Sequence, residues 1–251
     1  MPSKSEILML SKLNLKKFRD SENKFIVEGK RLVSEGIKSK FNCLQILITN
    51  EFEQKDFEYC NYLGSQNKKI SKISTTDFTK ISSTKNPQGV AAVFEIPEKS
   101  FSSFKNDEII ICLENISDPG NVGTILRSCD WFGVKTVLLS NDCAELYNPK
   151  VLRASMGAIF NLKIYENINL IEKLGELKKA NYKIYFADMD GTKYSEINYK
   201  EKSVITFCNE AFGPTKELKD VCDEAITIPK KGNIESLNVS AAAAVILSKL
   251  L

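Results

Sequence analysis

Apolar runs alternate with amphipathic segments through the second half of the chain. Isoleucine- and valine-rich runs, which predict buried strands, occupy 109–113, 136–139, 162–165, 182–187, 204–208 and 225–228. Apolar residues recur at helical spacing between them, most clearly over 119–132, 168–180 and 236–251. Strands that alternate with helices predict an α/β fold whose mostly parallel sheet is covered by helices on both faces.

The first 96 residues show shorter elements of both kinds. The same patterns predict helices at 7–18, 27–37 and 52–63 and strands at 44–49 and 89–96. A polar, serine-rich stretch follows at 97–107 and is typical of a linker. We therefore predict a small α/β domain at 1–96 and a second domain at 108–251.

Composition excludes several classes of protein. No run of about 18 apolar residues and no N-terminal signal core are present, which predicts a cytoplasmic protein without a membrane segment. The seven cysteines form no Cys-x-x-Cys pair, so we expect no structural zinc site. The chain also lacks histidine, which excludes Ser-His-Asp triads, Cys-His dyads and imidazole bases.

The net charge of +3 is unevenly distributed along the chain. Residues 1–40 contain ten Lys and Arg against five Asp and Glu, a balance of +5. Basic residues such as Lys16, Lys17, Arg19 and Arg31 are candidates for contact with nucleic-acid phosphates. The alternative interpretation is a solvated helix face.

Polar loops follow three of the predicted strands, at 114–123, 209–213 and 228–240. Ligands of parallel sheets bind beyond the carboxyl ends of the strands, so these loops predict one composite site. Ser117 or Asp118 can cap the helix that follows the first loop.

Two glycines and an arginine of that helix, Gly120, Gly123 and Arg127, fall on a face outside its apolar stripe. Bare backbone beside a guanidinium suits close approach of a phosphate or ribose. Alternatively, the glycines serve packing and Arg127 pairs with a surface acid.

Other nucleotide and phosphate motifs are weak or absent. Neither G-x-G-x-x-G nor a Walker-type loop follows any predicted strand. Asp188 and Asp190 resemble the carboxylate pair of haloacid-dehalogenase-like phosphatases, but the later acids that such enzymes need lie in an apparent helix. We interpret 188–192 as a turn.

Taken together, segments 118–127, 209–214 and 228–240 resemble the three motifs of the SpoU-type (TrmH-like) RNA 2′-O-ribose methyltransferases. Segment 148–158 is also similar to that family, so the resemblance covers 108–251. Residues 1–96 resemble the ribosomal-protein-like substrate-binding domain that often precedes it.

The resemblance implies a C-terminal α/β-knot fold, a deep trefoil, preceded by the small α/β domain. It also implies S-adenosyl-L-methionine as cofactor, a homodimer, no metal, and a structured RNA substrate, with ribosomal RNA favoured over transfer RNA. Its catalytic positions correspond to Asn121, Arg127, Glu210, Ser236 and Asn238. Its cofactor-binding positions correspond to Cys208, Gly213, Ile228, Leu237 and Asn238.

Two details of these assignments concern side-chain chemistry. Cys208 occupies a position that is usually glycine in the family, and Arg153 joins the expected RNA-binding residues. The family proposal makes the Arg127 position a general base, although a guanidinium is a poor one. Equally, Arg127 could grip a phosphate and stabilise alkoxide charge while the proton leaves to water or phosphate, with Glu210 orienting Arg127 or Asn121.

A rival class is a non-catalytic RNA-binding protein with the same fold. Retention of Arg127, Glu210, Ser236 and Asn238 argues against that class.

Overall fold

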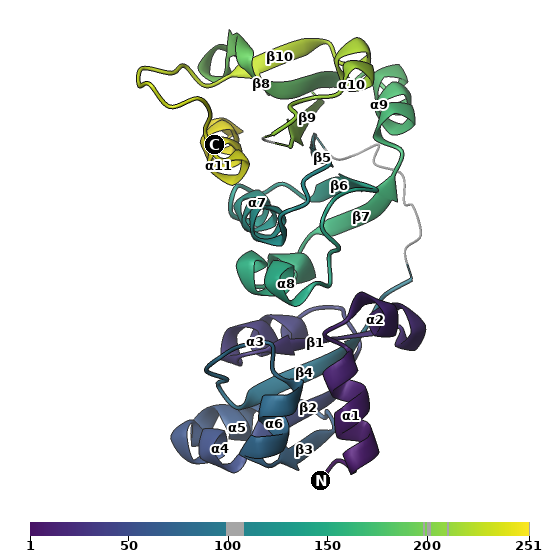
Figure 1. Cartoon of the computed structure of the whole chain (residues 1–251), viewed down its shortest axis with the longest axis vertical. Helices are drawn as coiled ribbons and strands as arrows, with labels where there is room; N and C mark the ends of the chain where they lie inside the picture. The colour runs from purple at the N-terminus through teal and green to yellow at the C-terminus, as the bar shows by residue number, and fades with distance from the viewer. Residues whose placement is uncertain (99–107, 198, 200–201, 210, 251) are drawn as a thin grey trace. The chain divides into compact units, whose positions relative to one another are not determined.

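The computed structural model describes residues 1–98, 108–197, 199, 202–209 and 211–250 (Figure 1). The chain divides into two compact units. Unit 1 comprises residues 1–98 and 147–160, and unit 2 comprises residues 99–146 and 161–251. Within the described residues, no helix is long and apolar enough to cross a membrane.

Unit 1 is built on a four-stranded mixed sheet in the order β1-β4-β2-β3. Strand β4 pairs antiparallel with both neighbours, and β2 pairs parallel with β3. The strands are β1 (Lys24–Glu28), β2 (Cys43–Thr49), β3 (Ile70–Ile73) and β4 (Val90–Glu95). The helices of residues 1–98 are α1 (Lys4–Lys12), α2 (Lys16–Glu22), α3 (Lys30–Lys38), α4 (Asn50–Lys55), α5 (Phe57–Gly64) and α6 (Thr75–Ile81).

All three of the expected N-terminal helices are wrong in their bounds, and the segment 52–63 is divided between α4 and α5 at Asp56. The start of the 27–37 segment belongs to β1, because Phe25, Ile26 and Val27 are buried and pair with β4. Gly29, at φ +95°, then turns the chain from β1 into α3. The segment 7–18 is two helices rather than one, since α1 ends at Lys12 and α2 begins at Lys16.

Residues 147–160 belong to the packing of unit 1, although the sequence pattern placed them in the second domain. They form α8 (Pro149–Ser155) and the 3₁₀ helix η1 (Ala158–Phe160). The Tyr147 ring lies 4.5 Å from the Phe25 ring, and the Phe160 ring lies 5.3 Å from that of Phe94. The expected boundaries, 1–96 and 108–251, remain a prediction about which parts fold independently.

Unit 2 contains a six-stranded sheet in the order β10-β8-β9-β5-β6-β7, with all neighbouring strands parallel. Its strands are β5 (Ile109–Glu114), β6 (Thr136–Ser140), β7 (Lys163–Ile168), β8 (Lys183–Lys193), β9 (Ser203–Cys208) and β10 (Glu224–Thr227). Its helices are α7 (Pro119–Trp131), α9 (Leu170–Lys179), α10 (Lys216–Val221) and α11 (Val239–Leu247), with 3₁₀ turns η2 (Tyr194–Glu196) and η3 (Ser248–Leu250).

Both faces of this sheet are covered, which explains its continuous apolar strands. Ile110 and Cys112 of β5 pack in one core with Leu174 of α9 and Leu218 of α10. Helices α7 and α11 pack against each other and lie on the other side of the sheet (Figure 1). The two helix layers bury the middle strands from both sides, and the polar loops start from the ends of these buried strands.

The segment 188–192 is strand rather than the expected turn. It lies in the extended second half of β8, where Thr192 is the register partner of Ile226 in β10. The register shifts between Ala225 and Ile226, whose partners are Phe186 and Thr192, so the extra residues of this irregularity lie in β8. Asp188 forms an ion pair of 3.2 Å with Lys219. The resemblance to a phosphatase nucleophile loop therefore has no structural support.

We predict that Gly36→Ala destabilises unit 1, because an added Cβ would overlap the Phe94 ring and lie 2.9 Å from Phe160 Cζ. Overpacking of this kind costs about 1–3 kcal/mol, which thermal unfolding followed by circular dichroism would show as a lower Tm. The matched control is Gly64→Ala, where no atom lies within 4 Å of the added Cβ. Equal Tm values for the two variants would contradict the close packing of α3 against the Phe94 and Phe160 rings.

Candidate active site

The three polar loops expected to form one site do follow strands whose carboxyl ends point to the same edge of the sheet. Strands β5 and β9 are neighbours, and Glu114 is the register partner of Cys208 where both end. Strand β10 lies at the sheet margin, and its loop leads back to α11. Side-chain hydrogen bonds then join the loops to one another.

A buried carboxylate anchors the second loop to the end of β5. Glu114 is 5% exposed and accepts hydrogen bonds from Thr215 N at 3.2 Å and Thr215 Oγ1 at 2.6 Å. Thr215 is also the N-cap of α10, accepting from Leu218 N. Because hydrogen bonds to an ionised acceptor are stronger than neutral ones, this pair fixes where the second loop ends.

The start of the second loop is tied to the first by amide side chains. Asn209 Nδ2 donates to the Asn115 carbonyl at 2.9 Å. Asn115 has a left-handed φ of +56°, and its N–H donates to Ser140 Oγ at the end of β6. Ser140 Oγ returns a hydrogen bond to Asn115 Oδ1 at 3.1 Å. The ends of β5, β6 and β9 are thereby held together.

The third loop meets the first through two asparagines. Asp118, one of the two expected caps, accepts from Asn121 N at the start of α7. Asn238 caps α11, and its Nδ2 donates to Asn121 Oδ1 at 3.1 Å. Two predicted catalytic positions, 117 residues apart, are therefore in direct contact.

The structure shows no such contact for the other predicted catalytic residues that it describes. Arg127 is exposed on α7, and among the described residues no hydrogen bond or ion pair involves its guanidinium. Ser236 is exposed in the loop before Asn238. Glu210 lies outside the described residues. The structure thus brings Asn121 and Asn238 together and places Arg127 on the exposed side of α7.

The predicted cofactor positions offer mainly neutral and main-chain groups. Cys208 is buried, and burial, reinforced by the neighbouring Glu114, raises the pKa of its thiol, which stays neutral. Gly213 has a φ of +66°, and its N–H donates to the Asn209 carbonyl. Ile228 is half-buried and Leu237 is 44% exposed.

The assignment of Arg19 as an RNA-binding residue is wrong. Arg19 is 2% exposed, and its Nη1 donates to the Leu13 carbonyl at 2.8 Å, so it stabilises the turn after α1 instead of contacting phosphate. Lys16, Lys17 and Arg31 are exposed, as phosphate contacts require.

The sequence interpretation missed the residues that support the site. Glu114 and Asn115 lay within the first polar loop but received no role there, and Thr215 follows directly after the second motif. A buried acid at a strand end, followed in another loop by a helix-capping threonine, is a weak signal for such an anchor. Nothing in the sequence singled out Ser140. In the part of the chain that the structure describes, no group of three or more His, Cys, Asp or Glu residues could hold a metal.

Family models match both parts of the chain. Residues 108–248 match the SpoU rRNA Methylase family, and residues 4–92 match the MRM3-like substrate binding domain. A Bacillus subtilis relative, the 23S rRNA (guanosine(2553)-2′-O)-methyltransferase RlmP, is 32% identical over 241 residues, which are 95% of this chain and 93% of the relative.

Solved structures agree with the family models. A Porphyromonas gingivalis protein described as an RNA methyltransferase of the TrmH family has a TM-score of 0.88 and 30% identity, covering 100% of this chain and 98% of its own. An RNA 2′-O ribose methyltransferase has a TM-score of 0.83 and 27% identity, covering 99% and 95%. The chain belongs to the SpoU rRNA methylase family. It is therefore an RNA methyltransferase.

We predict that Glu114→Gln lowers the affinity for S-adenosyl-L-methionine about tenfold in calorimetry, because two donors of Thr215 would face an amide. Losing a charge-assisted hydrogen bond costs about 1.5–3 kcal/mol, part of which loosens the second loop. Glu6→Gln is the control, since Glu6 also accepts a backbone N–H, that of Ser3, but belongs to unit 1. Unchanged affinity in Glu114→Gln would exclude an anchoring role.

Proposed function

We propose that this protein transfers a methyl group to a ribose 2′-OH of ribosomal RNA. The observation that carries the proposal is the hydrogen bond between Asn121 and Asn238, which draws the first and third family motifs to one point. The second motif is joined there through Asn209 and Asn115. Ribosomal RNA is favoured over transfer RNA because the Bacillus subtilis relative is a 23S rRNA methyltransferase and matches almost end to end.

S-adenosyl-L-methionine supplies an activated methyl group on a sulfonium sulfur. Residues 208–213 and 228–238 would hold it, with Leu237 and Ile228 against its nucleoside and loop main-chain groups on its polar atoms. The neutral thiol of Cys208 and the nearby carboxylate of Glu114 place no positive charge against the sulfonium. No metal takes part in this scheme.

Arg127 positions the RNA and stabilises charge. Its exposed guanidinium donates to the phosphate beside the target ribose. The 2′-oxygen then bonds to the methyl carbon while the carbon–sulfur bond breaks, and the electron pair of that bond stays on sulfur. Because a guanidinium holds its protons below a pH of about 12, the proton of the 2′-OH passes to water or phosphate and not to Arg127.

The remaining motif residues orient the reacting groups. Asn121 and Asn238, already paired, present amide groups to the ribose at the N-terminal ends of α7 and α11. Ser236 would bind the ribose or the cofactor tail, and Glu210 would orient Arg127 or Asn121. Each role is one of positioning, which is the main contribution a protein makes to a displacement between two bound substrates.

We further propose a knotted homodimer that acts in the cytoplasm. Strand β10 lies at the margin of the sheet, yet α11 packs on α7 and β9, so the C-terminal segment must return across the strand ends, as a deep trefoil requires. Large apolar side chains of unit 2 are exposed in the single chain, namely Trp131 at 80%, Phe212 at 89% and Ile234 at 67%. A second copy of the chain that covers these side chains would remove their apolar surface from water.

Unit 1 captures the RNA in this proposal. Its exposed basic residues, among them Lys16, Lys17 and Arg31, contact phosphates, which fix the position of the RNA without reading its sequence. The match of residues 4–92 to a substrate-binding domain supports this division of labour.

We predict that Arg127→Ala abolishes methyl transfer to ribosomal RNA, measured with radiolabelled cofactor, while cofactor affinity changes less than threefold. Arg127→Lys should recover little activity, because an ammonium lacks the planar fork of a guanidinium. Lys135→Ala, an exposed cation shortly after α7, is the control and should stay active. Near-normal transfer by Arg127→Ala would refute the assignment, and a wild-type protein that binds RNA but transfers no methyl group would favour the non-catalytic class.

We also predict that the wild-type protein sediments at twice its chain mass of 28.2 kDa at micromolar concentration. Trp131→Asp should raise the dissociation constant at least tenfold, because a charge would be buried at the covered surface. Phe57→Asp is the control, since Phe57 is 64% exposed in unit 1. A monomeric wild-type protein would contradict the homodimer.

A further inference from the structure

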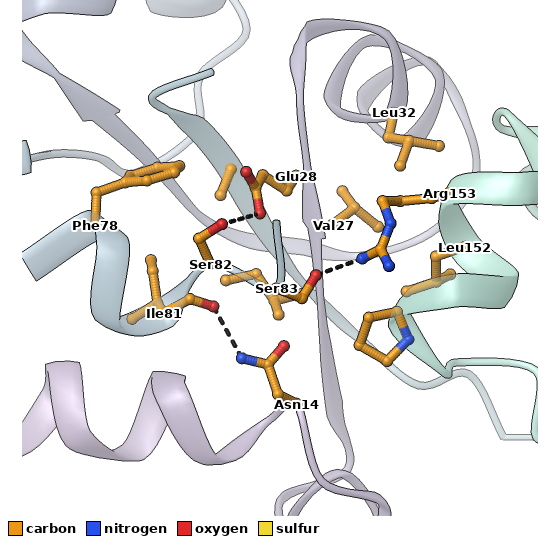
Figure 2. Close-up of a pocket in the computed structure, with 13 residues that line it drawn as sticks. Asn14, Val27, Glu28, Leu32, Phe78, Ile81, Ser82, Ser83, Leu152 and Arg153 are labelled. Carbon is orange, nitrogen blue, oxygen red and sulfur yellow. Dashed lines mark hydrogen bonds between the residues drawn. The ribbon is translucent and has the colours of Figure 1, made fainter. Parts of the chain in front are cut away.

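A cleft in unit 1 brings together three segments that are far apart in the sequence (Figure 2). Its lining includes the turn after α1, the loop after α6, and α8. The apolar part of the lining consists of Ile26, Val27, Leu32, Phe78, Ile81, Ala91, Pro149 and Leu152. Its polar part consists of Asn14, Glu28, Ser82, Ser83 and Arg153.

Side-chain hydrogen bonds hold the three segments in place around the cleft. Asn14 Nδ2 donates to the Ile81 carbonyl at 3.0 Å, which ties the first segment to the end of α6. Arg153 Nη1 donates to Ser83 Oγ at 2.5 Å, which ties α8 to the loop (Figure 2). Specific hydrogen bonds therefore define the walls of the cleft.

The acid that lines the cleft is already engaged by hydroxyl groups. Glu28 accepts hydrogen bonds from Ser82 Oγ and Thr84 Oγ1, each at 2.7 Å. Farther along the same loop, Gln88 Oε1 accepts from Lys30 N, so the loop is fixed at both ends. Both oxygens of Glu28 are thus occupied by hydroxyl donors, and the guanidinium of Arg153 is bonded to Ser83 instead.

Ser83 and Arg153 together offer donors suited to an oxyanion. Ser83 Oγ accepts from Arg153, so its own O–H remains able to donate. A guanidinium has five N–H donors, of which this hydrogen bond uses one. A phosphate group matches this arrangement of a guanidinium fixed beside a hydroxyl.

We propose that Ser83 and Arg153 form a clamp for a backbone phosphate of the RNA, an inference that rests on the proposed function. The clamp needs one residue from the N-terminal segment and one from residues 147–160, which the family model assigns to the methylase region. RNA capture therefore depends on both parts of the sequence, and the N-terminal residues alone carry half of this site.

The test is binding of the full chain to a fluorescein-labelled fragment of 23S ribosomal RNA, measured by anisotropy between 50 and 300 mM salt. Arg153→Met keeps the apolar stem that packs α8 and removes the charge. It should weaken binding about tenfold and reduce the slope of log affinity against log salt by about 0.7–0.9, the value for one phosphate contact. Ser83→Ala should weaken binding about threefold with an unchanged slope, since it removes a neutral donor.

Lys55→Met is the charge-matched control, because Lys55 is exposed at the end of α4 and does not line the cleft. It should retain wild-type affinity, and circular dichroism should show that every variant is fully folded at the temperature of the binding measurement. Wild-type affinity and slope in Arg153→Met, or wild-type affinity in Ser83→Ala, would overturn the clamp. A wild-type protein that binds this RNA with the expected slope but transfers no methyl group would overturn the proposed function alone.

Discussion

A carboxylate buried at the end of a central strand must be paired, and that requirement organises the carboxyl edge of unit 2. Glu114 ends β5 at 5% exposure, and its pairing with Thr215 fixes the end of the second loop. With that loop fixed, Asn209 can reach Asn115, and the first loop can present Asn121 to Asn238. Without these hydrogen bonds, each of the three loops would keep more conformational entropy, and their side chains would not be held in one arrangement.

The features that could be predicted from sequence are those with a local cause. Strands buried on both faces must be apolar throughout, so β5 and β9 stood out as continuous runs. Asp118 before Pro119 indicated the start of α7, and the structure confirms it. Parallel strands share one edge for their carboxyl ends, so the convergence of polar loops there followed from the strand assignment.

The errors arose where distant residues decide the outcome. Phe25 to Val27 is short enough to fit a helix or a strand, and only pairing with β4 settles it. The sequence pattern predicted an exposed Arg19, because the distribution of charge along a chain does not indicate which side chains are buried. In the structure its guanidinium is buried and donates a hydrogen bond to the Leu13 carbonyl. The anchor between Glu114 and Thr215 joins residues 101 positions apart, a relation that no local pattern encodes.

The placement of residues 147–160 has a consequence for synthesis on the ribosome. A chain emerges from its N-terminus, and domains generally fold as units during translation. Here Tyr147 and Phe160 pack on the aromatic rings of β1 and β4, so the core of unit 1 stays incomplete after its first 98 residues have appeared. The sheet of unit 1 therefore keeps part of its apolar surface exposed while the ribosome synthesises β5, α7 and β6 of unit 2. Synthesis rate over residues 99–160 therefore sets how long that apolar surface is open to chaperones and to misassembly.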